Sequence, residues 1–77
     1  MMPISLKFFN SLTKRQQRLV TLLSDGGKHS VISIANRLII GDPRAEIRDL
    51  RNLGIDVSDV WVKNRDGRGR HKLYFIR

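Results

Sequence analysis

One stretch of the sequence decides the fold: Asp42-Pro43-Arg44-Ala45-Glu46-Ile47-Arg48-Asp49-Leu50-Arg51-Asn52-Leu53-Gly54. Asp42 is a favoured N-cap residue, and Pro43 suits the first helical position because its missing N–H has no helical partner there. Gly54 suits the position just beyond a helix end, since glycine accepts the left-handed conformation. We therefore predict a helix from Pro43 to Leu53.

The predicted helix has two different faces. Ile47, Leu50 and Leu53 are spaced three apart and form an apolar stripe, which we expect to pack against the domain. The opposite face is polar, with the residues Arg44, Ala45, Arg48 and Asn52. Arginine bonds guanine and asparagine bonds adenine in the major groove, so this face is suited to duplex DNA. Taken alone, the pattern fits an ordinary amphipathic helix with a solvated basic face equally well.

Arg51 and Asp49 flank the polar face, and Glu46 does not lie on it. Glu46 falls on the packed side of the helix, so we expect its carboxylate to point away from an anionic partner. Arg51 lies nearer the core border, where its expected partner is a phosphate or an acid such as Asp56.

Two more helices are expected upstream. Thr13 and Gln16 have the spacing of a capping box, which predicts a helix from there to about Ser24, and Asp25-Gly26-Gly27 ends it. Its expected inward residues are Leu19, Leu22 and Leu23, together with Leu12 or Val20. Residues 28–32 are partly β-branched and predict a short extended segment, an edge strand.

The helix after this segment is expected to start at a serine cap, either Ser30 or Ser33. Its expected inward residues are Ile34, Ala35, Leu38 and Ile39. We expect a turn over residues 40–42, with Gly41 supplying an unusual backbone angle.

The last quarter of the chain predicts a β-hairpin over about residues 57–76. Two β-prone runs flank the glycine-rich loop Asn64–Gly69. Trp61, Leu73 and Phe75 are the expected inward residues, although the alternation also fits a phase shifted by one. The hairpin carries a cluster of cations: Lys63, Arg65, Arg68, Arg70 and Lys72.

Composition favours a polyanion as partner. The 77 residues contain 15 Lys and Arg against 7 acids, a formal charge of +8. From Val60 to Arg77 there are six cations and one acid, so five of the eight net charges lie there. Such a charge on so small a domain is typical of nucleic-acid binding.

Several other classes of protein are disfavoured. There is no cysteine, and His29 and His71 lie far apart, so we expect no metal and treat both histidines as surface residues. No nucleophile–base pair or phosphate loop is recognisable, which disfavours an enzyme, and we expect no cofactor. Neither an apolar run of roughly 18 residues nor a signal-peptide pattern is present, so we expect a cytoplasmic protein without a membrane partner.

The chain divides into two parts. Residues 1–11 show no clear period and are expected to be loosely ordered, with Phe8 and Phe9 anchoring them to the domain. Residues 12–77 form the domain. Its order of helix, short strand, helix, turn, helix and hairpin is an α+β fold with a winged helix-turn-helix layout, in which the hairpin is the wing.

Residues 30–76 resemble small winged helix-turn-helix proteins of phages and bacterial mobile elements. The resemblance rests on Ser30–Leu38, Asp42–Arg44, Ile47–Arg51, Trp61–Lys63 and Tyr74–Ile76. It implies sequence-directed binding of duplex DNA, often in regulation of the element's own genes. The turn between the helices is two residues longer than in phage repressors, and Ile39 stands where that pattern has glycine.

These observations define a candidate interface with double-stranded DNA. The helix 43–53 would enter the major groove, and the hairpin would contact phosphates or the minor groove. The candidate contacts are Arg44, Ala45, Arg48, Arg51, Asn52, Ser33, Lys63, Arg65, Arg68, Arg70 and Lys72. A short monomeric site favours a homodimer on DNA, and the expected role is a transcriptional regulator or an accessory factor of a mobile element. A protein-interaction module with an acidic partner and an RNA-binding module are the alternatives.

Overall fold

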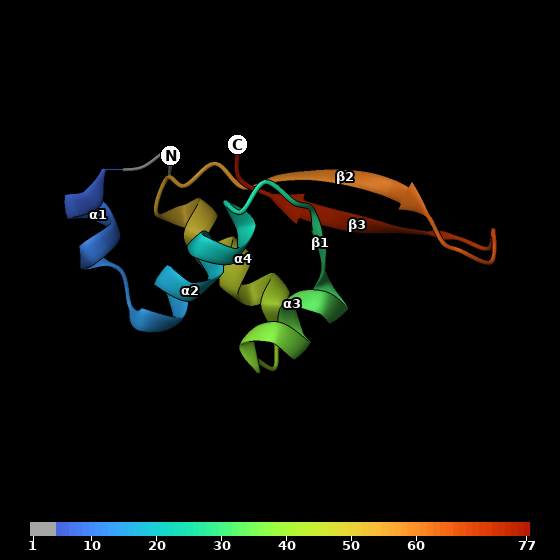
Figure 1. Ribbon diagram of the computed structural model, residues 1–77, viewed down its shortest axis with the longest axis horizontal. Coiled ribbons are helices and arrows are strands. Elements are labelled where there is room, and N and C mark those ends of the chain that lie inside the picture. The colour runs from blue at the N-terminus through green and yellow to red at the C-terminus, as the bar shows by residue number, and fades with distance from the viewer. Residues whose placement is uncertain (1–4) are drawn as a thin grey trace.

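The structure is a computed structural model, and it describes residues 5–77. Its elements are α1 (Leu6–Ser11), α2 (Lys14–Leu23), β1 (His29–Ser30), α3 (Val31–Leu38), α4 (Pro43–Asn52), β2 (Ser58–Lys63) and β3 (Arg70–Phe75). The strands form one antiparallel sheet in the order β1-β3-β2, with the helices beside one end of the hairpin (Figure 1). The predicted α+β class is confirmed, with one helix more than predicted.

Local capping signals place the helices where the sequence predicts them. The Thr13 hydroxyl accepts from the Gln16 N–H at 3.1 Å, while the Gln16 side chain accepts from the Thr13 N–H at 3.0 Å. Ser30 caps α3 by accepting from the Ser33 N–H, and Asp42 caps α4. Gly54 follows α4 with φ +91°, as a residue beyond a helix end does.

The turn between α3 and α4 differs from the prediction. Ile39 adopts the left-handed conformation with φ +54°, and its side chain is 90 % exposed, so the prediction that it faces inward is wrong. Helix α3 ends at Leu38, and this reversal of the backbone directs the next side chain, Ile40, into the core instead. The unusual angle thus falls on Ile39, at the position of the pattern's glycine, and not on Gly41.

One core connects the helices with the inner half of the sheet. Its buried members are Leu12, Leu19, Val20, Leu23, Ile34, Ile40, Ile47, Leu50, Ile55, Val57, Tyr74 and Ile76. The predicted core position of Leu53 is wrong, because it is the C-cap of α4 and is 46 % exposed. The chain reverses at Gly54, and Ile55 and Val57 return to the core in its place.

Strand β3 has the opposite phase to the one chosen from sequence, whereas Trp61 of β2 lies on the predicted face. Tyr74 is buried, whereas its neighbours Leu73 and Phe75 are only half-buried. Trp61 shares the face of Tyr74, since it pairs with Lys72 and directly opposed residues lie on one face. It is nevertheless 55 % exposed, so its predicted core position is wrong. The hairpin extends beyond the helices, and among the described residues no helix or strand lies over that half of the face (Figure 1).

The N-terminal segment contains a helix that the sequence did not predict. Helix α1 spans Leu6–Ser11 and is capped by Ser5, whose hydroxyl accepts from the Phe8 N–H. Phe8 and Phe9 are half-buried against the core, which confirms that they anchor this segment. Residues 1–4, part of the segment predicted to be loosely ordered, lie outside the described residues.

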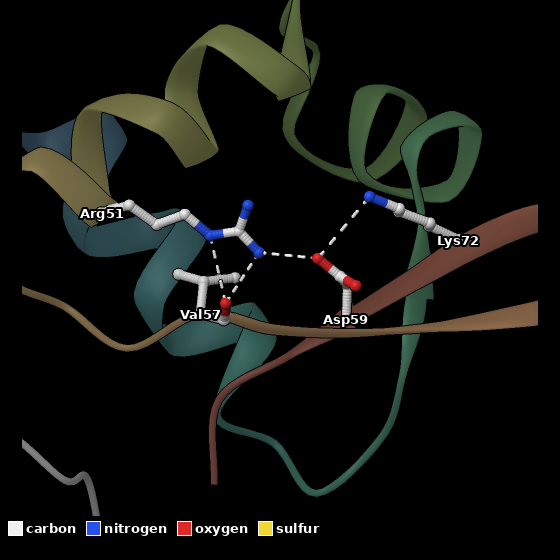
Figure 2. Close-up of polar contacts among 4 residues, drawn as sticks. All are labelled: Arg51, Val57, Asp59 and Lys72. Carbon is white, nitrogen blue, oxygen red and sulfur yellow. Dashed lines mark hydrogen bonds and ion pairs between the residues drawn. The ribbon is translucent and has the colours of Figure 1, made fainter.

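Arg51 fastens the hairpin to α4 (Figure 2). Its Nε and Nη2 donate to the Val57 carbonyl at 3.1 and 2.8 Å, and Nη2 also donates to Asp59 Oδ2 at 2.9 Å. The guanidinium carbon lies 5.9 Å from the centre of the Tyr74 ring. One side chain thus bridges the helix, the linker after it and the first strand of the hairpin.

We predict that Arg51→Met lowers the free energy of unfolding by about 1–2 kcal/mol, because hydrogen bonds from a partly exposed charged group are lost. Chemical denaturation measures this. Arg48→Met is the matched control on the same helix and should change stability by less than about 0.5 kcal/mol, since Arg48 is exposed. Equal losses for both variants would contradict the bridging role.

A second polar contact fixes the start of β1. His29 is buried, so the prediction of a surface residue is wrong for this histidine, while His71 is exposed as expected. His29 Nε2 lies 3.0 and 3.2 Å from the two carboxylate oxygens of Asp25, and the Gly27 N–H donates to Asp25 Oδ1 at 2.8 Å. The contact with His29, then that with Gly27, and the charge of Arg37 more weakly, lower the pKa of Asp25.

A lowered pKa makes Asp25 a source of stability above pH about 4 that is lost as the pH falls through the lowered value. We predict that an NMR titration finds the pKa of the Asp25 carboxyl below its ordinary value. In the His29→Gln variant the same pKa should move back upward. An unchanged titration curve in that variant would exclude His29 as the main cause.

Candidate nucleic-acid interface

Helix α4 presents one exposed line of polar side chains. Arg44, Arg48 and Asn52 are four residues apart, so they lie on one face, and all three are exposed. The Arg48 side chain is 71 % exposed, and its one ion-pair partner in residues 5–77 is the neighbouring Asp49, at 3.9 Å. Three hydrogen-bond donors therefore face solvent along the helix, as the sequence predicts.

The remaining residues of α4 are directed elsewhere. Ala45 is half-buried, and its N–H donates a hydrogen bond to the side chain of the cap residue Asp42. Glu46 accepts a hydrogen bond from Arg15 of α2 at 3.3 Å, and its side chain is only 19 % exposed. Arg51 pairs with an acid, but with Asp59 instead of the predicted Asp56. Its Nε and Nη2 donate to protein, so Arg51 positions the hairpin.

A set of hydrogen bonds centred on Asn64 shapes the tip of the hairpin. The Asn64 N–H donates to the Gly69 carbonyl at 3.2 Å, and its side-chain Nδ2 donates to the Arg68 carbonyl at 2.6 Å. Asn64 Oδ1 lies 2.6 Å from His71 Nδ1, and Asp66 accepts from the Arg68 N–H. The turn therefore has a defined backbone, on which Arg65 and Arg68 are exposed.

The helix-facing side of the hairpin continues this basic surface. Because Tyr74 pairs with Asp59, Trp61 with Lys72 and Lys63 with Arg70, all six side chains lie on one face. The Arg70 guanidinium and the Lys72 ammonium lie 5.5 and 5.0 Å from the centre of the Trp61 ring. Lys72 Nζ is also 3.9 Å from Asp59 Oδ2 (Figure 2).

A cleft separates this face from the helices. Its volume is about 850 Å³, and it is lined by Ser30, Val31, Ile32, Arg44, Trp61, Asn64, Arg70, His71, Lys72 and Tyr74. Arg44 comes from α4, and Arg70 and Lys72 come from β3, so residues far apart in the sequence meet in one site. The lining holds three permanent cations and no carboxylate. We call it the cationic cleft.

The predicted contact residues fall into three groups. Arg44, Arg70 and Lys72 line the cationic cleft. Arg48 and Asn52 extend the line along α4, and Lys63, Arg65 and Arg68 lie on the outer hairpin. Ser33 is half-buried in the first turn of α3, and its N–H donates a hydrogen bond to the hydroxyl of the cap residue Ser30.

Sequence reasoning missed two members of this site. Trp61 was expected in the core but forms a wall of the cationic cleft, and Asp59 holds both Arg51 and Lys72. The available signal was the alternation of β3: with Tyr74 inward, Lys72 and its partner Trp61 share that face.

Two features were not found in the described part of the chain. Among residues 5–77 there is no group of three His, Asp or Glu side chains that could hold a metal ion. In the same residues no helix has the length and apolar character needed to cross a membrane.

A comparison with protein families matches residues 14–76 to the winged helix-turn-helix domain. Comparisons with curated proteins and with solved structures gave no match. The matched span begins with α2 and ends just after β3, so it includes every described element except α1. Since the match covers most of the chain, this protein belongs to the winged helix-turn-helix domain family.

Proposed function

We propose that this protein binds double-stranded DNA, with α4 in the major groove and the hairpin as a basic wing on the neighbouring backbone or minor groove. The observation that carries the proposal is the cationic cleft, where Arg44 at the start of α4 faces Arg70 and Lys72 of β3. The start of a recognition helix normally enters the groove, and phosphates flank it. A phosphate strand between helix and wing would meet cations on both sides.

The two basic elements have different tasks in this proposal. Arg48 and Asn52 lie further along the exposed line of α4 and supply contacts to base edges. Lys63, Arg65, Arg68, Arg70 and Lys72 contact phosphates, with Arg65 and Arg68 at the tip able to reach the minor groove. Ser33, in the first turn of α3, adds a hydroxyl contact to a phosphate.

The biological role follows from DNA binding by a small basic domain. We propose a regulator of transcription or an accessory factor of a mobile element. A single copy reads a short site, so we also propose that two copies act together on DNA.

Binding to a pool of random duplexes by mobility shift is the direct test. We expect binding at low salt and a fall of log K with log [salt] with a slope of about −4 to −5, from roughly five phosphate contacts. Selection of bound sequences at physiological salt then measures specificity. No shift at low salt would favour an acidic protein partner, and preferential competition by structured RNA would favour RNA.

Two arginine variants separate the reading of bases from the binding of phosphates. Arg48→Ala should weaken the selected sequence about 5- to 150-fold and random duplexes far less, because a base contact is lost. Arg68→Ala should weaken all duplexes alike and reduce the salt slope by about 1. Arg18→Ala, an exposed arginine on α2, is the matched control and should change neither quantity. Equal losses across sequences for both Arg48 and Arg68 variants would refute this division.

A further inference from the structure

Strand β2 is an open edge of the sheet. The order β1-β3-β2 leaves one side of β2 without a neighbouring strand. Its six residues pair one for one with β3, from Ser58 opposite Phe75 to Lys63 opposite Arg70. Natural edge strands are normally protected by charged side chains, a proline, a bulge or a covering element, and β2 carries two charged residues, Asp59 and Lys63. The sequence Ser-Asp-Val-Trp-Val-Lys contains no proline, and its unbroken register leaves no bulge.

The register shows which backbone groups face the open side. The Asn64 N–H donates to the Gly69 carbonyl, so Asn64 occupies a hydrogen-bonded pair with β3. These pairs alternate along an antiparallel ladder, and therefore Val62, Val60 and Ser58 also bond to β3. The N–H and C=O groups of Asp59, Trp61 and Lys63 point away from it. The Val57 carbonyl also points away from β3, and it accepts hydrogen bonds from Arg51 of α4.

The side chains at these three positions fit a second copy of the same strand. When two β2 edges run antiparallel with Trp61 opposite Trp61, Asp59 of each copy lies opposite Lys63 of the other. Val60 then faces Val62 across the junction on the other side of the sheet. A shift by two residues in one direction places Asp59 opposite Trp61, and a shift in the other direction places it opposite Arg65, which lies beyond the end of β2. In residues 5–77 the second carboxylate oxygen of Asp59, Oδ1, accepts no hydrogen bond and so is available to that lysine.

We propose that two copies of this protein associate through antiparallel pairing of their β2 edges, centred on Trp61. This names the contact for the two-copy binding proposed above, and it rests on that part of the proposed function. The pairing forms about six backbone hydrogen bonds and joins the two sheets into one of six strands.

The symmetry of this contact agrees with binding to DNA. A two-fold axis through an antiparallel ladder is normal to the sheet, so both copies keep their helix-facing sides on the same side. Asp59 and Lys72 point to that side in Figure 2, toward α4. Both cationic clefts and both α4 helices therefore face the same way. Such an arrangement matches the two halves of a palindromic site.

The contact is small for a permanent dimer. Two six-residue edges bury less than the roughly 1,200 Å² of a stable interface. We expect a reversible dimer that forms as the concentration rises from about 10 μM toward 1 mM, and sedimentation measures it. A monomer throughout this range would overturn the proposal.

Introduced cysteines test the register, since the chain has none of its own. Under mild oxidation Trp61→Cys should give a disulfide-linked dimer, because residues paired across the axis have Cα atoms about 5.5 Å apart. Lys63→Cys is the matched control on the same face. Its two copies are about 14 Å apart along the strand and should not cross-link. Equal cross-linking at both positions, or none at Trp61→Cys, would overturn the pairing.

A pair of charge variants tests the contact without oxidation. Lys63→Glu places an acid opposite Asp59 in both halves of the junction and should weaken dimerisation about tenfold or more. Arg65→Glu changes the net charge equally at the loop beside it and should leave the dimer intact. Equal weakening by both, or by neither, contradicts the proposal. All these measurements are made without DNA, so failure of DNA binding appears separately, as a missing mobility shift of the unsubstituted protein.

Discussion

The geometry of the site depends on one side chain, Arg51. Helix α4 ends at Asn52, and a short linker joins it to β2, which begins at Ser58. Arg51 reaches from the last turn of α4 to the Val57 carbonyl and to Asp59, which in turn lies 3.9 Å from Lys72 (Figure 2). Arginine suits this place because its planar fork can donate in two directions at once. The angle between α4 and the hairpin is thereby set by contacts within the protein.

Most acids of the chain contact other groups of the protein. Asp25 contacts His29, Glu46 contacts Arg15, and Asp59 holds Arg51 and Lys72. Asp42 and Asp66 accept from backbone N–H groups. Five of the seven carboxylates thus stabilise the fold. Six of the seven lie between Asp42 and Asp66, among the cations of α4 and the hairpin, so the basic surface there depends on the cations that these acids do not contact.

Local signals in the sequence were sufficient for the elements but not for every side chain. Thr13, Asp42 and Gly54 act within one helical turn, and the helices begin and end where they predict. Ile39, Leu53 and Trp61 were assigned to the core from periodicity, and all three are exposed. The first two lie where the backbone leaves helical geometry, so the period no longer applies. Trp61 has the right face but lies beyond the reach of the helices, which depends on how far the hairpin projects. For the same reason the sequence could place Arg44 and the hairpin cations on two elements, while only the fold brings Arg44, Arg70 and Lys72 into one cleft.

The projecting half of the hairpin adds little to the core, yet its backbone is tightly organised. Beyond Trp61 none of the hairpin side chains as far as His71 is buried, so hydrophobic packing does not hold that turn. Asn64 does so instead, with contacts to Gly69, Arg68 and His71. Ordering a free loop on binding costs conformational entropy, and a turn already fixed by hydrogen bonds avoids most of that cost. Arg65 and Arg68 are exposed on this defined backbone. In the proposed function this combination suits the hairpin for contacts to phosphates, and the reading of bases is left to α4.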